Sequence, residues 1–177
     1  RAKIYIYGDI ISDTEASWLK ILDDGTLGYQ YPTKIKEQLD AIKGKPIDVY
    51  IASDGGDVAA GIAIYNMLIA HDAPVVVHID SWAASIASVI AMAGNKIIMP
   101  ENVFLMIHNP TCGVYGSADY LQSVATWLAK IQSMICSIYA KNANVSESEI
   151  QEMMDNETWY TAKEALSVFG DKITVTD

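Results

Sequence analysis

Apolar and polar residues alternate along the chain with two distinct periods. Short apolar runs, typical of strands buried within a sheet, occur at residues 4–7, 48–52, 75–79, 97–99 and 103–107. Between them, apolar residues at helical spacing predict helices from the expected N-cap Thr33 to Gly44, over 58–70 and over 84–93. This order of elements predicts the α/β class. At 177 residues, the chain is expected to form one domain, residues 1–177.

A long helix is predicted in the second half of the chain. Ser117 is its candidate cap, and one apolar stripe at helical spacing continues to about Ala140. Further apolar side chains lie off that stripe, at Tyr120, Trp127 and Met134. This second apolar face is expected to pack either in the chain's own core or against another subunit.

Two capping boxes, at 146–149 and 161–164, predict two shorter helices, of which the second ends at Gly170. Residues 154–159 between them are expected to be a linker. The segment 12–31, which contains Asp23-Asp24-Gly25, mixes helical and turn signals and is left without an assignment.

Residues suited to acyl-transfer chemistry follow three of the predicted strands. Gly55-Gly56 follows the strand at 48–52, Ser85 follows that at 75–79, and His108 follows that at 103–107. In open α/β sheets the carboxyl ends of parallel strands meet at one edge, where ligands bind. Because backbone donors, a nucleophile and a base are three parts of a serine hydrolase site, the pattern predicts such a site at this edge.

Each of these residues also has a structural explanation. Ser85 precedes an apolar helix and could be a simple N-cap, and Gly55-Gly56 could be a tight turn. Among the three histidines, a structural role is expected for His71, near a helix C-terminus, and for His78, inside a strand. His108 is therefore the candidate base.

Charge and composition exclude several classes of partner. The 12 basic and 22 acidic residues give a net charge of −10, which repels nucleic acid and anionic lipid. The longest uncharged stretch, residues 81–95, is shorter than the ~20 residues needed to span a bilayer. Cys112 and Cys136 form neither a disulfide framework nor a zinc motif. A cytoplasmic protein with reduced thiols, no metal and no cofactor is expected.

Four motifs occur in the order that resembles the proteolytic subunit of Clp protease, a serine peptidase family with a crotonase-like fold. They are the glycine-pair segment 51–65, Ala83-Ala84-Ser85, Met106-Ile107-His108-Asn109-Pro110, and the segment 157–165. The resemblance extends from about residue 4 to 173. It implies a ββα superhelical fold with a protruding long helix.

The resemblance also implies residue roles. Ser85 would be the nucleophile and His108 the general base of a Ser-His-acid triad. The N–H groups of Gly56 and Ile86 would form the oxyanion hole. In this family the third triad member is usually Asp, whereas this chain has Glu157 at the matching position.

Two further features of the site follow from the resemblance. Asp155 is the alternative to Glu157 as the third triad member. An extended peptide would pair its backbone with the chain beside Asp57 and Asn109, which favours peptides over small esters. A protein or peptide is therefore the expected substrate.

The resemblance implies peptide hydrolysis inside a homo-oligomer, with heptamer-type stacked rings joined through the helix 117–140. Asp57-Val58, the Ala-Gly-Asn turn at 93–95 and Glu157-Thr158-Trp159 resemble the phage-encoded branch, which is similar to head-maturation proteases that process capsid or scaffold proteins. The chain begins almost at its first strand, without the segment that contacts an ATPase in housekeeping enzymes. An AAA+ unfoldase is therefore a doubtful partner.

Two other functions remain open. A crotonase-type acyl-CoA enzyme would share the fold and the oxyanion hole, but its acid–base work would fall to carboxylates near the glycine pair, such as Asp57. An inactive scaffold subunit of a capsid or ring would keep the assembly without turnover. A fluorophosphonate probe separates the first alternative from a serine hydrolase, and a casein-cleavage assay separates the second.

Overall fold

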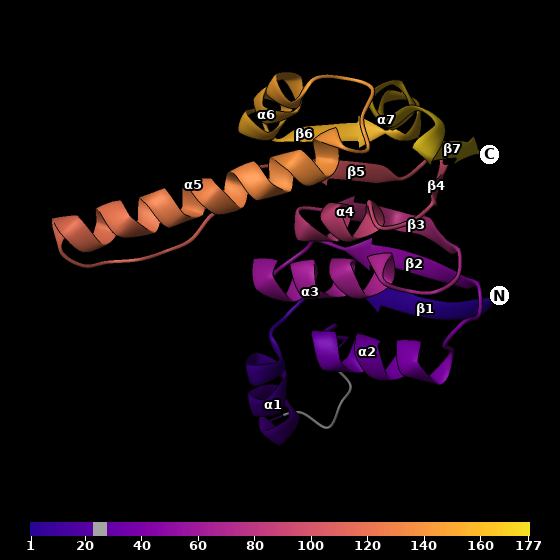
Figure 1. The fold of residues 1–177 in the computed structure, drawn as a ribbon, viewed down its shortest axis with the longest axis horizontal. Coiled ribbons are helices and arrows are strands. Elements are labelled where there is room, and N and C mark those ends of the chain that lie inside the picture. The colour runs from indigo at the N-terminus through magenta and orange to yellow at the C-terminus, as the bar shows by residue number, and fades with distance from the viewer. Residues whose placement is uncertain (23–27) are drawn as a thin grey trace.

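The computed structural model describes residues 1–22 and 28–177, so Asp23-Asp24-Gly25 lies outside the described residues. The described part of the chain forms a seven-stranded sheet (Figure 1). Its main path is parallel, in the order β1 (Ala2–Tyr7), β2 (Ile47–Ser53), β3 (Val75–Ala84), β4 (Lys96–Pro100) and β7 (Ile173–Thr176). The α/β class is thus confirmed.

Along the edge opposite β2, strand β3 pairs with two strands in turn. Its first half pairs with β4, and its second half, Trp82–Ala84, pairs in parallel with β5 (Phe104–Ile107). A seventh strand, β6 (Thr158–Thr161), pairs antiparallel with β5. The predicted linker at 154–159 is therefore shorter than expected, because α6 (Glu147–Asp155) ends within it and Thr158 already belongs to β6. The split brings the end of β3 beside the end of β5.

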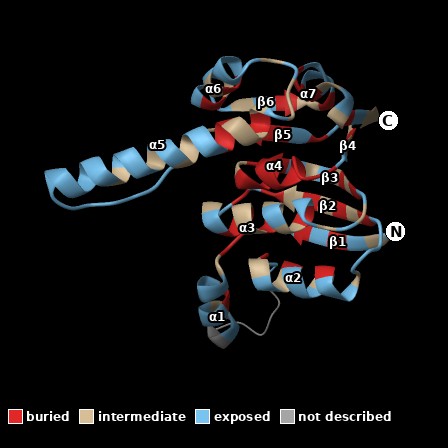
Figure 2. Cartoon of the chain, in the orientation of Figure 1, coloured by how far each residue is buried: buried red, intermediate tan, exposed pale blue. Residues whose placement is uncertain are grey.

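The helices α2 (Pro32–Ala41), α3 (Val58–Ile69) and α4 (Ile86–Ala91) lie over one face of the strands β1–β3 (Figure 1). That face carries alternate buried residues of each strand, such as Ile6 and Ile51. Every residue of α4 is buried, as its colour in Figure 2 shows. The central position of α4 follows from its sequence, which has no charged residue.

Capping residues explain most helix boundaries. The two predicted capping boxes form, at the start of α6 (Glu147–Asp155) and of α7 (Ala162–Phe169). The predicted start at Thr33 was wrong, since α2 begins with Pro32, whose fixed φ suits the first helical position. The unassigned segment contributes α1 (Asp13–Leu22), and a 3₁₀ turn, η1 (Gly170–Lys172), leads into β7.

Helix α5 (Ala118–Ala140) extends away from the rest of the molecule (Figures 1 and 2). Only its C-terminal part is buried, through Ile135, Cys136 and Tyr139. The second apolar face does not pack in the chain's own core. The side chains of Tyr120, Trp127 and Met134 are 51%, 60% and 42% exposed. No helix in the described ranges is long and apolar enough to cross a membrane.

Candidate active site

Ser85 lies in the turn that joins β3 to α4, in an unusual backbone conformation. Its φ is 56° and its ψ is −131°, a region that costs a non-glycine residue about 1–3 kcal/mol. The turn is held because the Ser85 N–H donates to the Met106 carbonyl oxygen at 3.1 Å. Ser85 occupies the N-cap position of α4, as the structural explanation expected, but its hydroxyl makes no capping hydrogen bond, so capping does not account for the hydroxyl. It is available for chemistry.

Glycines allow α3 and the glycine-pair loop to approach this turn closely. A Cβ added to Gly55, whose φ is +101°, would lie 2.8 Å from the Ser85 Cβ and 3.2 Å from the Ile86 nitrogen. A Cβ added to Gly61 in α3 would lie 2.1 Å from Cγ1 of Ile86. Larger residues at either position would force the start of α4 away from the loop.

His108 follows β5 and faces Ser85. Its Nε2 lies 2.7 Å from the Ser85 Oγ, the separation of a good hydrogen bond. The pairing of Ala84 with Met106 in neighbouring parallel strands brings the two side chains together at the carboxyl edge. With the proton on Nδ1, Nε2 accepts the hydrogen bond from the hydroxyl, which is the arrangement a general base needs.

Glu157 approaches the other nitrogen of the same ring. Its Oε2 lies 3.6 Å from Nδ1 of His108, an ion-pair separation that is longer than a hydrogen bond. Ile107 and Thr158 form the last pair of the β5–β6 ladder, so His108 and Glu157 follow directly beyond its end. Glu157 has a φ of 47°, and its side chain is 59% exposed.

The carboxylate of Asp155, the alternative acid, is hydrogen-bonded to groups other than the His108 imidazole. Its Oδ1 accepts hydrogen bonds from Nδ2 of Asn109 and from Nε2 of Gln151, each at 2.8 Å. These bonds, with that from Asn109 the larger cause, hold the pKa of the Asp155 carboxyl below its usual value. Within the described ranges Asp155 forms no ion pair with His108. The structure therefore brings Glu157, and not Asp155, to the imidazole.

Gly56 belongs to the loop that packs against the Ser85 turn through Gly55, and Ile86 directly follows Ser85. Gly56 has a φ of +145°, and Ile10 fixes its loop by accepting from the Asp57 N–H at 2.8 Å and donating to the Gly55 carbonyl at 2.9 Å. Ile86 is the first residue of α4, so its N–H has no acceptor within the helix. Within residues 1–22 and 28–177, neither N–H has a hydrogen-bond partner, as an oxyanion site requires.

Comparison with known proteins identifies the family. A family model described as Clp protease matches residues 30–174, most of the chain. The chain belongs to the Clp protease family. The ATP-dependent Clp protease proteolytic subunit 1 of Chlamydia abortus is 32% identical, with 82% of this chain and 83% of that protein covered. Subunit 2 of Treponema denticola is also 32% identical, with 83% and 76% covered.

A solved structure shows that the fold of the family is retained. A point mutant of ClpP1 from Listeria monocytogenes superposes with a TM-score of 0.79 at 23% identity, covering 99% of this chain and 91% of that one. The predicted Clp-type fold is thus confirmed. The relatives named above are bacterial Clp subunits, and the predicted likeness to the phage branch is not borne out by them.

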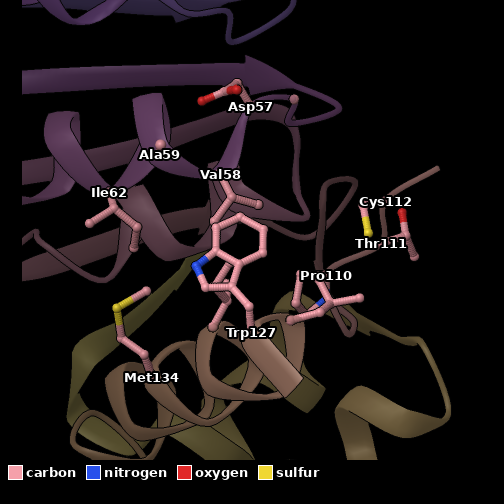
Figure 3. Close-up of a pocket in the computed structure, with 12 residues that line it drawn as sticks. Asp57, Val58, Ala59, Ile62, Pro110, Thr111, Cys112, Trp127 and Met134 are labelled. Carbon is pink, nitrogen blue, oxygen red and sulfur yellow. The ribbon is translucent and has the colours of Figure 1, made fainter. Parts of the chain in front are cut away.

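In this Clp family member, a mostly apolar cavity of about 520 Å³ opens beside the site (Figure 3). Its walls come from the start of α3, the loop after His108 and the middle of α5. Trp127 and Met134 of α5 face Val58 and Ile62 of α3 across it (Figure 3). Val58 and Pro110 also line the small recess against Ser85 and His108. Sequence patterns missed this cavity, because its wall combines distant segments.

Tyr139 is a second feature that the sequence analysis missed. Its buried hydroxyl lies 2.6 Å from Oγ of Ser88, and that Oγ donates to the Ser85 carbonyl at 2.7 Å. Burial raises the pKa of Tyr139, so its hydroxyl stays protonated. Tyr139 and Ser88 thus hold the Ser85 carbonyl at the first turn of α4 from the buried side of the helix. The only sequence signal for this role is the position of Tyr139 near the end of the apolar stripe.

The other candidate residues have different surroundings. Asp57 caps α3, since its Oδ1 accepts from the Ala60 N–H at 2.7 Å. Asn109 turns its side chain towards α6, and Cys112 and Cys136 are free thiols. Across the part of the chain that the structure describes, no cluster of three or more histidine, cysteine or acidic side chains could hold a metal ion.

Proposed function

We propose that this protein is a serine endopeptidase that hydrolyses peptide bonds through an acyl-enzyme on Ser85. The observation that carries the proposal is the 2.7 Å contact between Oγ of Ser85 and Nε2 of His108, made by a hydroxyl that serves no capping role. The family membership supports it, because the relatives are named as proteolytic subunits.

The proposed first step transfers the Ser85 proton to Nε2 of His108 as Oγ attacks the peptide carbonyl carbon. The N–H groups of Gly56 and Ile86 then donate to the oxyanion of the tetrahedral intermediate. His108 returns the proton to the leaving amine, and the acyl-enzyme forms. In the second half-reaction, His108 takes a proton from water as the water attacks the carbonyl carbon of the acyl-enzyme. His108 then returns the proton to Oγ of Ser85, which releases the carboxylic acid product and restores the free hydroxyl.

Glu157 is proposed to orient the imidazole and to stabilise the imidazolium that forms during each step. At 3.6 Å from Nδ1, its carboxylate needs a small inward movement to accept a hydrogen bond. Such contacts often tighten only when substrate is bound. Its longer side chain, compared with Asp, provides the reach for this movement.

The surroundings of Ser85 favour an extended peptide as substrate. We expect the backbone beside Asp57 and Asn109 to pair with the substrate strand. The cavity lined by Val58, Pro110 and Trp127 has the volume and the apolar surface for a large apolar side chain next to the scissile bond.

A fluorophosphonate probe tests the proposed chemistry. Wild-type protein should be labelled on Ser85 and should cleave fluorogenic peptides that have a large apolar residue before the scissile bond. Ser85→Ala should lose labelling and turnover while its thermal unfolding stays close to that of the wild type, because the hydroxyl makes no structural hydrogen bond to α4. Labelling of Ser85→Ala at full strength would refute the assignment.

The proposed assembly is a closed homo-oligomeric ring, with heptamer-type rings stacked through α5. The exposed apolar residues of α5 support this, since a helix with two apolar faces needs a partner for the second. The relatives are named as ATP-dependent proteases, which favours an AAA+ unfoldase as a partner for this chain too. Processing of capsid proteins remains a prediction from short sequence segments alone.

The two other functions gain no support from the site. An acyl-CoA enzyme would use a free carboxylate near the glycine pair, whereas that of Asp57 is engaged as the cap of α3. A scaffold subunit would not need the contact between Ser85 and His108, or the strained backbone that presents the hydroxyl.

A further inference from the structure

Three side chains beside the site form a closed hydrogen-bonded network. Asn109 donates to Asp155 at 2.8 Å, Gln151 donates to the same carboxylate oxygen at 2.8 Å, and Gln151 also donates to Oδ1 of Asn109 at 3.1 Å. Both amide side chains are oriented by these bonds. We refer to Asn109, Gln151 and Asp155 as the amide–carboxylate network.

The network joins the two loops that hold the proposed base and acid. Asn109 directly follows His108, and Asp155 precedes Glu157 by two residues. The β5–β6 ladder holds the two segments together up to its last pair, Ile107 with Thr158, and does not extend to His108 and Glu157. Beyond that pair, the network links the two loops through side chains, in addition to the ion pair between Glu157 and His108.

The position of Asp155 is unfavourable for the helix itself. Asp155 is the last residue of α6, where the helix dipole disfavours a negative charge. Its carboxylate is also exposed, so it contributes no buried packing. The two amide donors compensate for this location, and they explain why a carboxylate occurs there.

Glu157 has few other restraints. Its side chain is mostly exposed, and its backbone has a positive φ. Two hydrogen bonds nearby end on backbone carbonyls of α6: the Glu157 N–H donates to Met154 at 3.2 Å, and the Thr158 hydroxyl donates to Met153 at 2.7 Å. These fix the Glu157 backbone relative to α6, whose Ile150 and Met154 pack in the core, but neither bond reaches Asn109 or His108.

We propose that Asp155, with Asn109 and Gln151, is a positioning residue that sets the distance between Glu157 and His108. It acts through the two loops and does not touch the substrate. The inference rests on the proposed function, since it concerns the same triad. It also gives Asp155 a role distinct from that of the third triad member.

Steady-state kinetics on the assembled protein test this role. Asp155→Ala should lower kcat roughly tenfold to a hundredfold, the usual cost of a displaced catalytic group, while KM stays near the wild-type value. Asp155→Asn should lose much less, because its amide oxygen still accepts the bonds from Asn109 and Gln151. If the charge alone mattered, the two variants would lose equally.

A double-mutant cycle adds a second readout. Asn109→Ala should reduce kcat about as much as Asp155→Ala, and the double variant should lose no more than either single variant, because the same bond is removed. Ser146→Ala is the matched control: it removes the N-cap of α6 but leaves the network intact. It should lower the melting temperature without changing kcat.

Four results would overturn the proposal: wild-type kcat in Asp155→Ala, equal losses in Asp155→Ala and Asp155→Asn, additive losses in the double variant, or a loss of kcat that accompanies a changed sedimentation coefficient. Failure of the proposed function is a separate outcome. It would show as wild-type protein that a fluorophosphonate does not label, whatever residue occupies position 155.

Discussion

At the scale of single residues, the site depends on backbone conformations that few side chains adopt. Ser85 and Glu157 are the two non-glycine residues with positive φ in the described ranges, and both belong to the proposed triad. Such strain persists only where the surrounding structure enforces it. Here the Met106 carbonyl holds Ser85, and the end of α6 holds Glu157. The strain is therefore concentrated where the chemistry is proposed.

Glu157→Gln tests the proposed role of the carboxylate. The amide keeps the shape of the side chain but cannot stabilise an imidazolium, so kcat/KM should fall by up to roughly 10⁴-fold, as for a triad acid replaced by its amide. Glu157→Asp should retain more activity, although its shorter side chain increases the distance to Nδ1. Peptide hydrolysis by both variants measures this order. A fully active Glu157→Gln would show that another group orients His108.

At the scale of elements, the sequence predicts the strands that precede Gly56, Ser85 and His108, but it does not predict β6. The apolar runs that became β2, β3 and β5 are easily recognised in the sequence, although burial alternates along β2 and along the first half of β3. By contrast, β6 has four residues, two of them threonine, and its pairing with β5 joins segments that are distant in the sequence. Periodicity within a short window does not detect such a strand.

The contact between α3 and α4 gives a prediction at the same scale. In Gly61→Ala, the added Cβ would lie 2.1 Å from Cγ1 of Ile86, so the helices must separate. We expect a loss of about 1–3 kcal/mol in the free energy of unfolding, typical of overpacking, and a lower kcat because the Ile86 N–H moves away from the oxyanion. Urea unfolding and peptide hydrolysis measure the two effects.

Gly44→Ala serves as the control for a glycine without neighbours, since a Cβ there would meet nothing within 4 Å. Its φ of +72° adds some backbone strain, so a modest loss of stability is expected, with unchanged kcat. Equal kcat in Gly61→Ala and the wild type would contradict the proposed role of Ile86.

The candidate site was predictable only in part, for physical reasons. Ser85 and His108 follow strands whose parallel pairing can be anticipated, so their meeting at one sheet edge follows from topology. The choice between Glu157 and Asp155 depends on which way two exposed carboxylates turn beyond the end of a ladder. That detail is set by tertiary hydrogen bonds, which no local pattern records.

At the scale of the whole molecule, α5 has an apolar surface that the rest of the described chain does not cover. It projects from the domain with exposed Tyr120, Leu121 and Trp127, and the structure describes no segment that covers them. Exposed apolar surface of this kind marks a protein–protein contact. A ring assembly would bury it and would place the sites of many copies in one enclosed space.

Leu121→Asp tests the proposed assembly. A charge on this exposed apolar face should oppose subunit contact, so sedimentation should shift from an oligomer towards the 19.3 kDa monomer. Gln122→Asp adds the same charge at a neighbouring exposed polar position and should sediment like the wild type. A monomeric wild-type protein at micromolar concentration would contradict the ring itself.

The double use of α5 has a consequence for specificity. Its Trp127 and Met134 form one wall of the cavity beside Ser85, yet the same helix has little contact with the rest of its own subunit along most of its length. An isolated subunit would therefore have a loosely held wall and poor selectivity among peptides. Neighbouring copies would hold that wall in place and so determine which side chains the cavity accepts. The selectivity of the enzyme would therefore depend on assembly.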